Sequence, residues 1–499
     1  MSLAVYLVVT LGFAAGALAT RGRRAGATAI GLVGLVAATG AALAINPTEL
    51  VVIGQGGLAT SAYLRLFLVL GSLVGLGLAI AGLAGGARSD APMVTLATLG
   101  LAALTLSLTD PRAAVVAGTT GGLFGVWLTL SPGEDRWGAT LGIRELRAVA
   151  IAGAMAIAAT AWIDRDLTQL AAEPVVFGLA YLAFALAVAL RFGAIPFHLW
   201  AARLTDAAPE TALPIITVLA PASLAIVALA WTDASIAPLL VDLELERIVV
   251  IVVAVASIVL AALAALVQDD LEHVVGYSIV GDAGVVLLAL AVLDPAGWAP
   301  ARIWILAFIV CRSAFAAWAG GVRTVFGTGR VPSLRGWARR SPILAVAFGL
   351  IVVAAVGLPG LAAFEARSSL VGLAVVGPVA SLVSIGTLAP LTYYARLLGL
   401  GLARPTGAVE GASDWRPQLR RPDLTRPASW IRTTWDLNRA FSGALIATLL
   451  GVLALATSAG AFAAPEAAAG LPAILEGPSQ SVPSARESGQ PSFQPIPIP

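Results

Sequence analysis

The chain has 499 residues, of which 59% are hydrophobic and only 12% charged, and its mean hydropathy is +0.92. A soluble domain carries about 25% charged residues, so this composition cannot cover a water-facing surface of that size. The charges lie in short polar segments between long apolar runs, which is typical of a chain whose solvent is lipid. The formal net charge of +2 gives no indication of nucleic-acid binding.

Two further absences concern chemistry. The single cysteine, Cys311, excludes an internal disulfide framework, a zinc knuckle or an iron–sulfur cluster made by this chain alone. The sequence contains no lysine, so all 30 basic residues are arginine. This matters wherever a membrane protein needs a basic group that releases its proton, because arginine stays protonated. No metal-ligand cluster or Ser/His/Asp constellation is visible.

Long apolar segments are the main feature of the sequence. A membrane-spanning helix needs about 20 apolar residues, and about fourteen segments qualify. The sequence therefore predicts an all-α polytopic membrane protein. The predicted spans are 2–20, 27–45, 63–85, 91–109, 113–131, 147–163, 175–195, 213–232, 247–267, 274–293, 302–322, 341–362, 369–399 and 440–464.

The arginines between spans predict the orientation. We expect the first span not to be a cleaved signal peptide, because its basic cluster at 21–24 follows the apolar run. The positive-inside rule keeps that cluster cytoplasmic, which places the N-terminus outside and, after an even number of spans, the C-terminus outside too. Three later arginine groups fall on the same side: 136–147, 323–340 and 416–439. The tail from 465 is predicted to be disordered.

Proline and glycine interrupt two predicted spans that are five spans apart. The first interruption contains Pro196 and the second Pro359. Broken helices at such an offset are typical of inverted repeats and tend to line a polar pathway. Two ordinary kinked helices would produce the same sequence pattern. The ionisable residues beside the interruptions are Arg191, His198, Glu365 and Arg367.

Two ionisable residues lie deep inside predicted spans. An ionisable group at that depth costs about 3 kcal/mol and needs a reason. Asp282 is too short to reach the interface, so we expect a function or a buried pair, with Arg312 as a candidate counter-charge or pathway residue.

Arg191 either lines the pathway or extends to the interface. His198 either relays protons near neutral pH or caps the broken helix.

Two other polar groups lie near the ends of spans. Glu272 is read as part of a solvated loop or of the pathway. Arg396 follows Tyr393 and Tyr394, a pattern that anchors a helix end at the membrane interface.

Four segments, in order across about 190–400, resemble the antiporter-like membrane subunits of NADH:quinone oxidoreductase, respiratory complex I. The details are closest to the subunit N type, whose relatives include the M and L types and the large subunits of multi-subunit sodium/proton antiporters. The segments are PFHLW at 196–200, QDDLEHVVGYSI at 268–279, RGWARRSP at 335–342 with GLPGLAAF at 357–364, and YYAR at 393–396.

The resemblance implies two inverted five-helix repeats and a chain of buried charges that translocates protons when quinone is reduced elsewhere in the complex. It also implies other membrane-arm subunits as partners, contact with quinone only through them, no bound cofactor, no bond chemistry by this chain alone, and a place in the plasma membrane. The implied divisions are N-terminal helices 1–90, repeats 91–245 and 246–400, a cytoplasmic loop with the last helix 401–464, and the tail 465–499.

Several positions depart from the family pattern. An amine relay needs a pKa that burial can push toward neutrality, whereas arginine only biases its neighbours. The family's fifth-helix glutamate falls on Thr120, its seventh-, eighth- and twelfth-helix lysines fall on Arg191, Pro221 and Arg367, its tenth-helix histidine falls on Asp282, and the aspartate after its tryptophan motif falls on Arg203.

Three functions therefore remain open. In the first, protons move on carboxylates and histidine, while Arg191 and Arg367 act as fixed counter-charges. In the second, the chain is a structural membrane-arm subunit that does not pump. In the third, it belongs to a cation/proton antiporter or another membrane complex, since a fold does not settle a function. The carriers in the first function would be Asp282, Glu365, Glu272 and His198.

Overall fold

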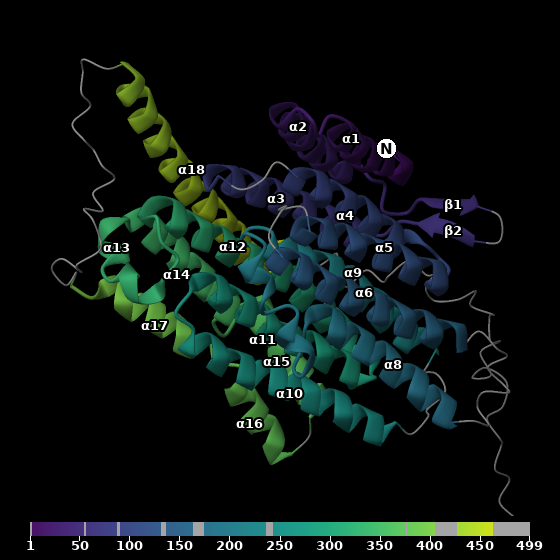
Figure 1. The fold of residues 1–499 in the computed structure, drawn as a ribbon. Coiled ribbons are helices and arrows are strands. Elements are labelled where there is room, and N and C mark those ends of the chain that lie inside the picture. Colours follow the sequence, from purple (N-terminus) through teal and green to yellow (C-terminus); the bar gives the residue numbers. More distant parts are fainter. Residues whose placement is uncertain are drawn as a thin grey trace, which may run out of the picture.

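Long apolar helices that lie side by side make up most of the chain (Figure 1). The predicted disordered tail lies outside the residues described in this computed structural model. The described residues are 2–53, 56–86, 90–130, 136–162, 174–235, 243–375, 377–404 and 427–462.

Eight α-helices lie among the described residues of the first half of the bundle. Helices α1 and α2 lie along one side of the bundle against α3 and α4 (Figure 1). These eight helices are α1 (Leu3–Ala19), α2 (Arg24–Leu43), α3 (Ala62–Ala84), α4 (Asp90–Ser107), α5 (Pro111–Leu130), α6 (Arg136–Trp162), α8 (Pro174–Phe192) and α9 (Ala220–Ser235).

The second half begins at α10, which packs against α11 over much of its length. The last described helix, α18, crosses the bundle and packs against α12, α14 and α3. The helices of this half are α10 (Glu244–Val267), α11 (Leu271–Val292), α12 (Trp298–Phe326), α13 (Trp337–Arg340), α14 (Pro342–Val356), α15 (Ala362–Ala374), α16 (Pro378–Gly386), α17 (Pro390–Leu402) and α18 (Pro427–Ser458).

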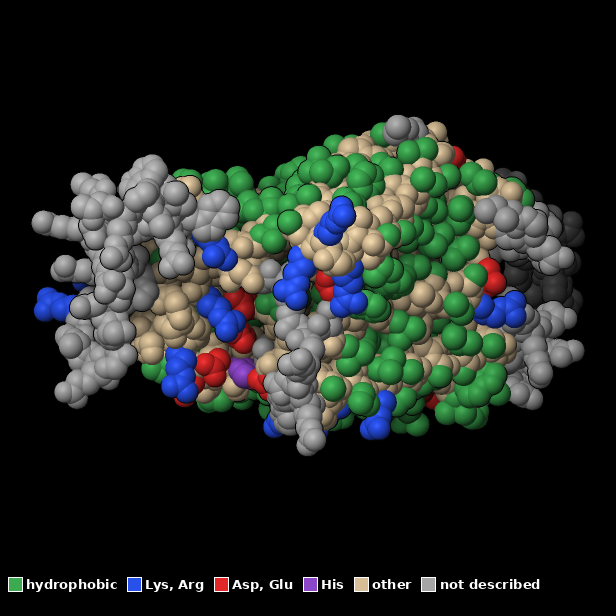
Figure 2. Space-filling view, turned by 45° about the horizontal axis from the view of Figure 1, so that its top comes forward, with side chains coloured by type: hydrophobic (Ala, Val, Ile, Leu, Met, Phe, Trp, Pro, Cys, Tyr) green, Lys and Arg blue, Asp and Glu red, His purple; other side chains and the backbone are tan. Residues whose placement is uncertain are grey.

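Ten helices among the described residues are long and apolar enough to cross a membrane, and α1 and α14 are shorter apolar helices. The prediction of a mostly helical, multi-pass membrane protein is therefore confirmed. Hydrophobic side chains cover broad areas of the face shown in Figure 2, whereas charged side chains gather in a group toward the left, a second group near the centre and a few at the right. This distribution fits a belt of lipid around the bundle.

Three details differ from the sequence prediction. Helix α6 begins at Arg136, eleven residues before the predicted span at 147. Its first turns contain charged residues, which interrupt the apolar run from which the span was predicted. The predicted span 369–399 is divided among α15, α16 and α17 by a positive-φ glycine, Gly377, and by Pro390. A short antiparallel hairpin, β1 (Leu50–Ile53) with β2 (Gly56–Ala59), joins α2 to α3 in a chain predicted to be all-α.

Both predicted interruptions are real breaks in the helices. Helix α8 ends at Phe192, and the chain continues through short 3₁₀ turns, η1 (Phe197–Leu199) and η2 (Leu204–Asp206), to a π-helical turn, η3 (Ile215–Leu219), that leads into α9. The second break separates α14 from α15, where Gly357 and Gly360 have φ of 70° and 92°. Such positive values are open to glycine at little cost.

Candidate functional site

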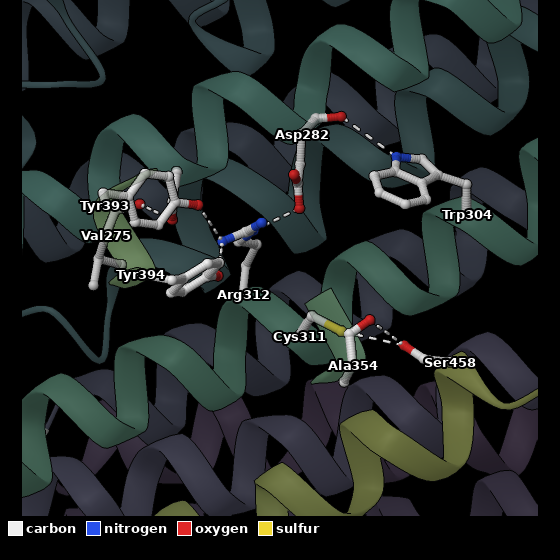
Figure 3. A network of polar contacts seen from close by, with 10 residues as sticks. Val275, Asp282, Trp304, Cys311, Arg312, Ala354, Tyr393, Tyr394 and Ser458 are labelled. Carbon is white, nitrogen blue, oxygen red and sulfur yellow. Dashed lines mark hydrogen bonds and ion pairs between the residues drawn. The ribbon is translucent and has the colours of Figure 1, made fainter. Parts of the chain in front are cut away.

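The clearest polar centre joins α11 and α12 in the middle of the bundle. Arg312 donates from Nε to Oδ2 of Asp282 at 2.6 Å, and the two side chains are 0% and 8% exposed. Figure 3 shows the guanidinium lying between the carboxylate and two tyrosine rings. The structure thus pairs the two deeply placed charges that the sequence singled out.

The tyrosines Tyr393 and Tyr394 come from α17. Arg312 Nη1 donates to the Tyr394 hydroxyl at 2.8 Å and to the Tyr393 hydroxyl at 3.4 Å, and both rings are buried. Their prediction as interfacial anchors is therefore wrong, because their helix turns them inward onto a buried cation. Arg396, one turn later, does hold a helix end, since it donates to the Gln268 carbonyl at 2.6 Å and pairs with Asp269.

Arg367 lies near this centre on α15 and is 4% exposed. Its guanidinium lies 5.8 Å from the ring centroid of Trp304 and 5.5 Å from that of Phe364, which are cation–π distances. The charges of Asp282 and Arg312 both act on it. Trp304 also donates to the Asp282 carbonyl at 3.4 Å, so one indole contacts both parts of the centre.

A second basic centre occupies the first half of the chain. Arg191, in the last turn of α8, is 2% exposed, and neither terminal nitrogen has a hydrogen-bond partner among the described residues. The guanidinium packs on Gly122 of α5 so closely that a Cβ there would lie 2.6 Å from Nη2. The absence of a side chain at Gly122 therefore makes room for the arginine.

The carboxylate of this second centre is Glu145 on α6, which the sequence analysis missed. Glu145 is fully buried, accepts a hydrogen bond from the Thr129 hydroxyl at 2.5 Å, and interacts electrostatically with Arg191. Its place on a helix face with Leu141, Ala148 and Ala152, all buried at helical spacing, was the available signal. That face was overlooked because the predicted helix began two residues later.

Glu272 and His198 lie beside the first turns of α11. Glu272 forms an ion pair with Arg323, which also pairs with the buried Glu210 at 3.0 Å. The His198 ring lies 6.2 Å from that of Tyr277, and its Nδ1 is buried without a hydrogen-bond partner in the described part of the chain. Tyr277 lies on α11, halfway between Glu272 and Asp282.

Glu365 joins neither centre, although it is two residues from Arg367. It is exposed on the outside of α15 and accepts a hydrogen bond from the Gly360 amide at 3.3 Å. Positions two apart on a helix point to different sides, which explains why Glu365 faces out while Arg367 faces in. Pro359 is exposed in the same break, and Pro196 follows a cis peptide bond in the first one.

The remaining positions that depart from the family pattern form no ion pair with the residues that the structure describes. Thr120 donates to the Val116 carbonyl of its own helix at 2.8 Å, as a helical threonine commonly does. Pro221 lies in the first turn of α9 directly after the π-helical turn, and Arg203 is exposed. Among the described residues, no group of three or more histidine, cysteine or acidic side chains could hold a metal ion.

Comparison with known proteins shows which proteins this chain is similar to. Residues 149–392 match the family model described as NADH:quinone oxidoreductase/Mrp antiporter, TM. The chain is 32% identical over 216 residues to NADH-quinone oxidoreductase subunit N 2 of Solidesulfovibrio magneticus, and 27% identical over 223 residues to subunit N of Thiobacillus denitrificans. These matches cover 43% and 44% of this chain, and the chain spans 44% and 45% of the length of those two relatives.

Solved structures establish the fold over a longer stretch. A chain of the Mrp complex from Dietzia sp. DQ12-45-1b superposes with a TM-score of 0.73 at 19% identity, covering 96% of this chain and 97% of that one. A chain of respiratory complex I from Thermus thermophilus gives 0.66 at 20% identity, covering 90% and 97%. The resemblance predicted from the sequence is confirmed: residues 149–392 of this membrane chain match the NADH:quinone oxidoreductase/Mrp antiporter model, and the chain is similar to subunit N relatives over about half of their length.

Proposed function

We propose that this chain is a membrane-arm subunit of a complex I-like NADH:quinone oxidoreductase and contributes to proton translocation coupled to quinone reduction. The observation that carries the proposal is the set of charged side chains buried inside the bundle. Ionisable groups at such depth are costly and mark ion pathways. The buried charges that form the two centres are Glu145, Arg191, Asp282, Arg312 and Arg367, and Asp90, Glu210 and Arg302 are buried elsewhere among the described residues.

The topology that goes with this function has fourteen spans and two inverted five-helix repeats, at 91–245 and 246–400. The N-terminal helices 1–90 precede them, and 401–464 and the tail 465–499 follow. The similar surroundings of Arg191 and Arg367 support the repeat, since each is a buried arginine beside a broken helix, five predicted spans apart. In this topology both termini lie on the outer side of the plasma membrane.

Protons would move on carboxylates and histidine, because arginine keeps its proton. A proton that reaches Asp282 neutralises the carboxylate and removes its attraction for Arg312. The guanidinium would still be held by the hydroxyl of Tyr394. Asp282 is therefore the carrier, and Arg191, Arg312 and Arg367 are fixed charges that set when it loads and unloads.

The uptake side of this path lies along α11. Glu272 and Asp282 are ten residues apart on that helix, which is about 15 Å of helix rise. His198 lies beside Tyr277 in the interval, and its Nδ1 has no hydrogen-bond partner among the described residues. Water would bridge the steps between these groups, and Glu365 would join the path only where another subunit covers it.

Other parts of the assembly would supply the redox chemistry. Quinone and the redox centres would belong to partner subunits, and this chain would hold no cofactor and catalyse no bond chemistry by itself. Its partners would be other membrane-arm subunits and the lipid bilayer.

Two observations favour alternative functions. The close contact between Asp282 and Arg312, reinforced by tyrosine, would suit a permanent structural pair in a subunit that does not pump. The superposition on a chain of the Mrp complex over 96% of this chain would suit a subunit of a multi-subunit cation/proton antiporter. Copurification with quinone-reducing peripheral subunits would exclude the antiporter.

The decisive experiment compares Asp282→Asn with the unaltered chain in the purified complex, reconstituted into sealed vesicles. We expect fewer protons translocated per electron pair, with assembly and electron transfer intact. The matched control is Asp294→Asn, because Asp294 is exposed and an asparagine can still accept from the Ala296 amide, as Asp294 does at 2.7 Å. An unchanged ratio for Asp282→Asn would favour the structural function.

A further inference from the structure

The outward face of α15 differs from the exposed face of α10, which lies against lipid in this arrangement. Its exposed residues are Glu365, Ser368, Ser369 and Gly372, at the i, i+3, i+4 and i+7 spacing of a single helix face. None of the residues exposed on α15 is a large hydrophobic residue. The face is therefore polar and narrow, in the middle of a hydrophobic chain.

Helix α10 provides the contrast. Its exposed residues include Leu245, Val252 and Leu260, which are 77%, 60% and 49% exposed. A helix that faces lipid shows such apolar side chains, whereas small and hydroxyl-bearing residues gather where membrane helices pack together. Helix α10 thus has the face expected toward lipid, and α15 has the face expected toward another helix.

The break that precedes α15 lies open on the same side. Leu358 is 54% exposed, and Pro359 and Gly360 are exposed beside it. Non-helical backbone at membrane depth is tolerated where protein or a water-filled cavity covers it, because lipid offers no hydrogen bonds. The Glu365 carboxylate accepts from the Gly360 amide but has no ion-pair partner among the described residues.

We propose that this face docks a transmembrane helix of a different membrane subunit, one that presents a basic side chain opposite Glu365. The docking face consists of 358–360 and the exposed residues of α15. Ser368 and Gly372 are four apart, the small-xxx-small spacing that lets two helices approach closely. This inference deepens the proposed function, since it rests on the chain acting inside a membrane assembly.

The border of the docking face fits the same partner. Helix α16, which stands at the lower edge of the bundle in Figure 1, packs beside α15 and exposes Leu382 and Ile385 by 69% and 67%. These side chains supply apolar contact next to the polar stripe. A second copy of this chain fits poorly, because a symmetric contact would bring two Glu365 carboxylates together.

The test places a photoreactive benzoylphenylalanine at Ser369 in the native complex, with Val252 on α10 as the matched lipid-facing position. We expect Ser369 to form an adduct with a different membrane subunit and Val252 to form adducts with lipid alone. An adduct between two copies of this chain, or lipid adducts alone at Ser369, would overturn the proposal. This readout does not depend on pumping, so it stands apart from the vesicle experiment.

The charge is tested separately by Glu365→Gln and Glu365→Asp in the photoreactive chain. Losing a hydrogen bond to a charged group costs about 1.5–3 kcal/mol, so we expect retention of the partner after detergent extraction to weaken about tenfold or more in Glu365→Gln. Glu365→Asp keeps the charge and should retain most of the partner. Equal retention in all three chains would rule out a basic group opposite Glu365.

Discussion

The two halves of the chain bury their arginines in different ways. In the second half, Arg312 contacts Asp282 directly at 2.6 Å and is bonded to tyrosine as well. In the first half, Arg191 interacts with Glu145 through charge alone, and both terminal nitrogens of Arg191 lack hydrogen-bond partners in the described part of the chain. Arg312 is closely bonded through Nε and Nη1 and leaves one terminal nitrogen, Nη2, without a partner among the described residues, whereas Arg191 leaves both.

The two arginine centres of this lysine-free chain can therefore respond to different changes. Protonation of the carboxylate in a closely bonded pair would remove its attraction for the arginine, so we expect the second centre to have two distinct states. A loosely held arginine with free donors can instead hold water or respond to a neighbouring charge. We therefore expect the stability of the second centre to be sensitive to the loss of Arg312, and that of the first centre to be sensitive to added side-chain atoms beside Arg191.

The largest expected effect comes from Arg312→Leu. This change leaves Asp282 buried without its partner, and breaking a buried pair typically costs about 3–5 kcal/mol. We expect a much lower midpoint of thermal unfolding for the purified protein in detergent, followed by fluorescence-detected gel filtration.

The control for this change is the double variant Arg312→Leu with Asp282→Asn. Removing both charges takes away the uncompensated carboxylate, so most of the lost stability should return. If the single and double variants unfold at the same midpoint, the pair is not the coupled unit that the structure indicates.

A smaller effect is expected from Tyr394→Phe, which removes the closer hydroxyl from Arg312. A hydrogen bond to a charged group contributes about 1.5–3 kcal/mol. Tyr393→Phe is the matched control, because its hydroxyl lies at 3.4 Å rather than 2.8 Å and should matter less. The same unfolding assay ranks the two variants, and a larger loss in Tyr393→Phe would contradict the geometry.

The smallest expected effect tests the first centre through Gly122→Ala. The added Cβ would lie 2.6 Å from Arg191 Nη2, and overpacking of this kind costs about 1–3 kcal/mol. Gly349→Ala is the control, since a Cβ there meets nothing within 4 Å and the residue is exposed on α14. Equal unfolding midpoints for the two variants would mean that the guanidinium of Arg191 shifts freely.

Hydropathy and charge made much of this arrangement predictable. Every predicted span overlaps a helix, and the depth of Asp282 and Arg312 in their runs was enough to suggest a pair. Helical spacing alone could also have separated Glu365 from Arg367, because residues two apart do not share a face. That inference was available from the sequence and was not drawn.

Other features required the packed structure. Glu145 lies between two exposed arginines, Arg144 and Arg147, so the local sequence resembles a solvated segment. Only the packing of α5, α6 and α8 turns that carboxylate toward Arg191. The inward rotation of Tyr393 and Tyr394 likewise depends on where α17 meets α11, and this contact is far away in the sequence.

The position of α18 has a consequence for biosynthesis. Leu450 fills the space beside Gly77 on α3, and the Ser458 hydroxyl donates to the Ala354 carbonyl at the end of α14. Helices inserted early in translation therefore keep an unfilled seam until the ribosome has released residues more than 350 positions later, a delay of about 20–70 s at 5–20 residues per second. A nascent chain that stalls before α18 would expose this seam to the proteases of membrane quality control.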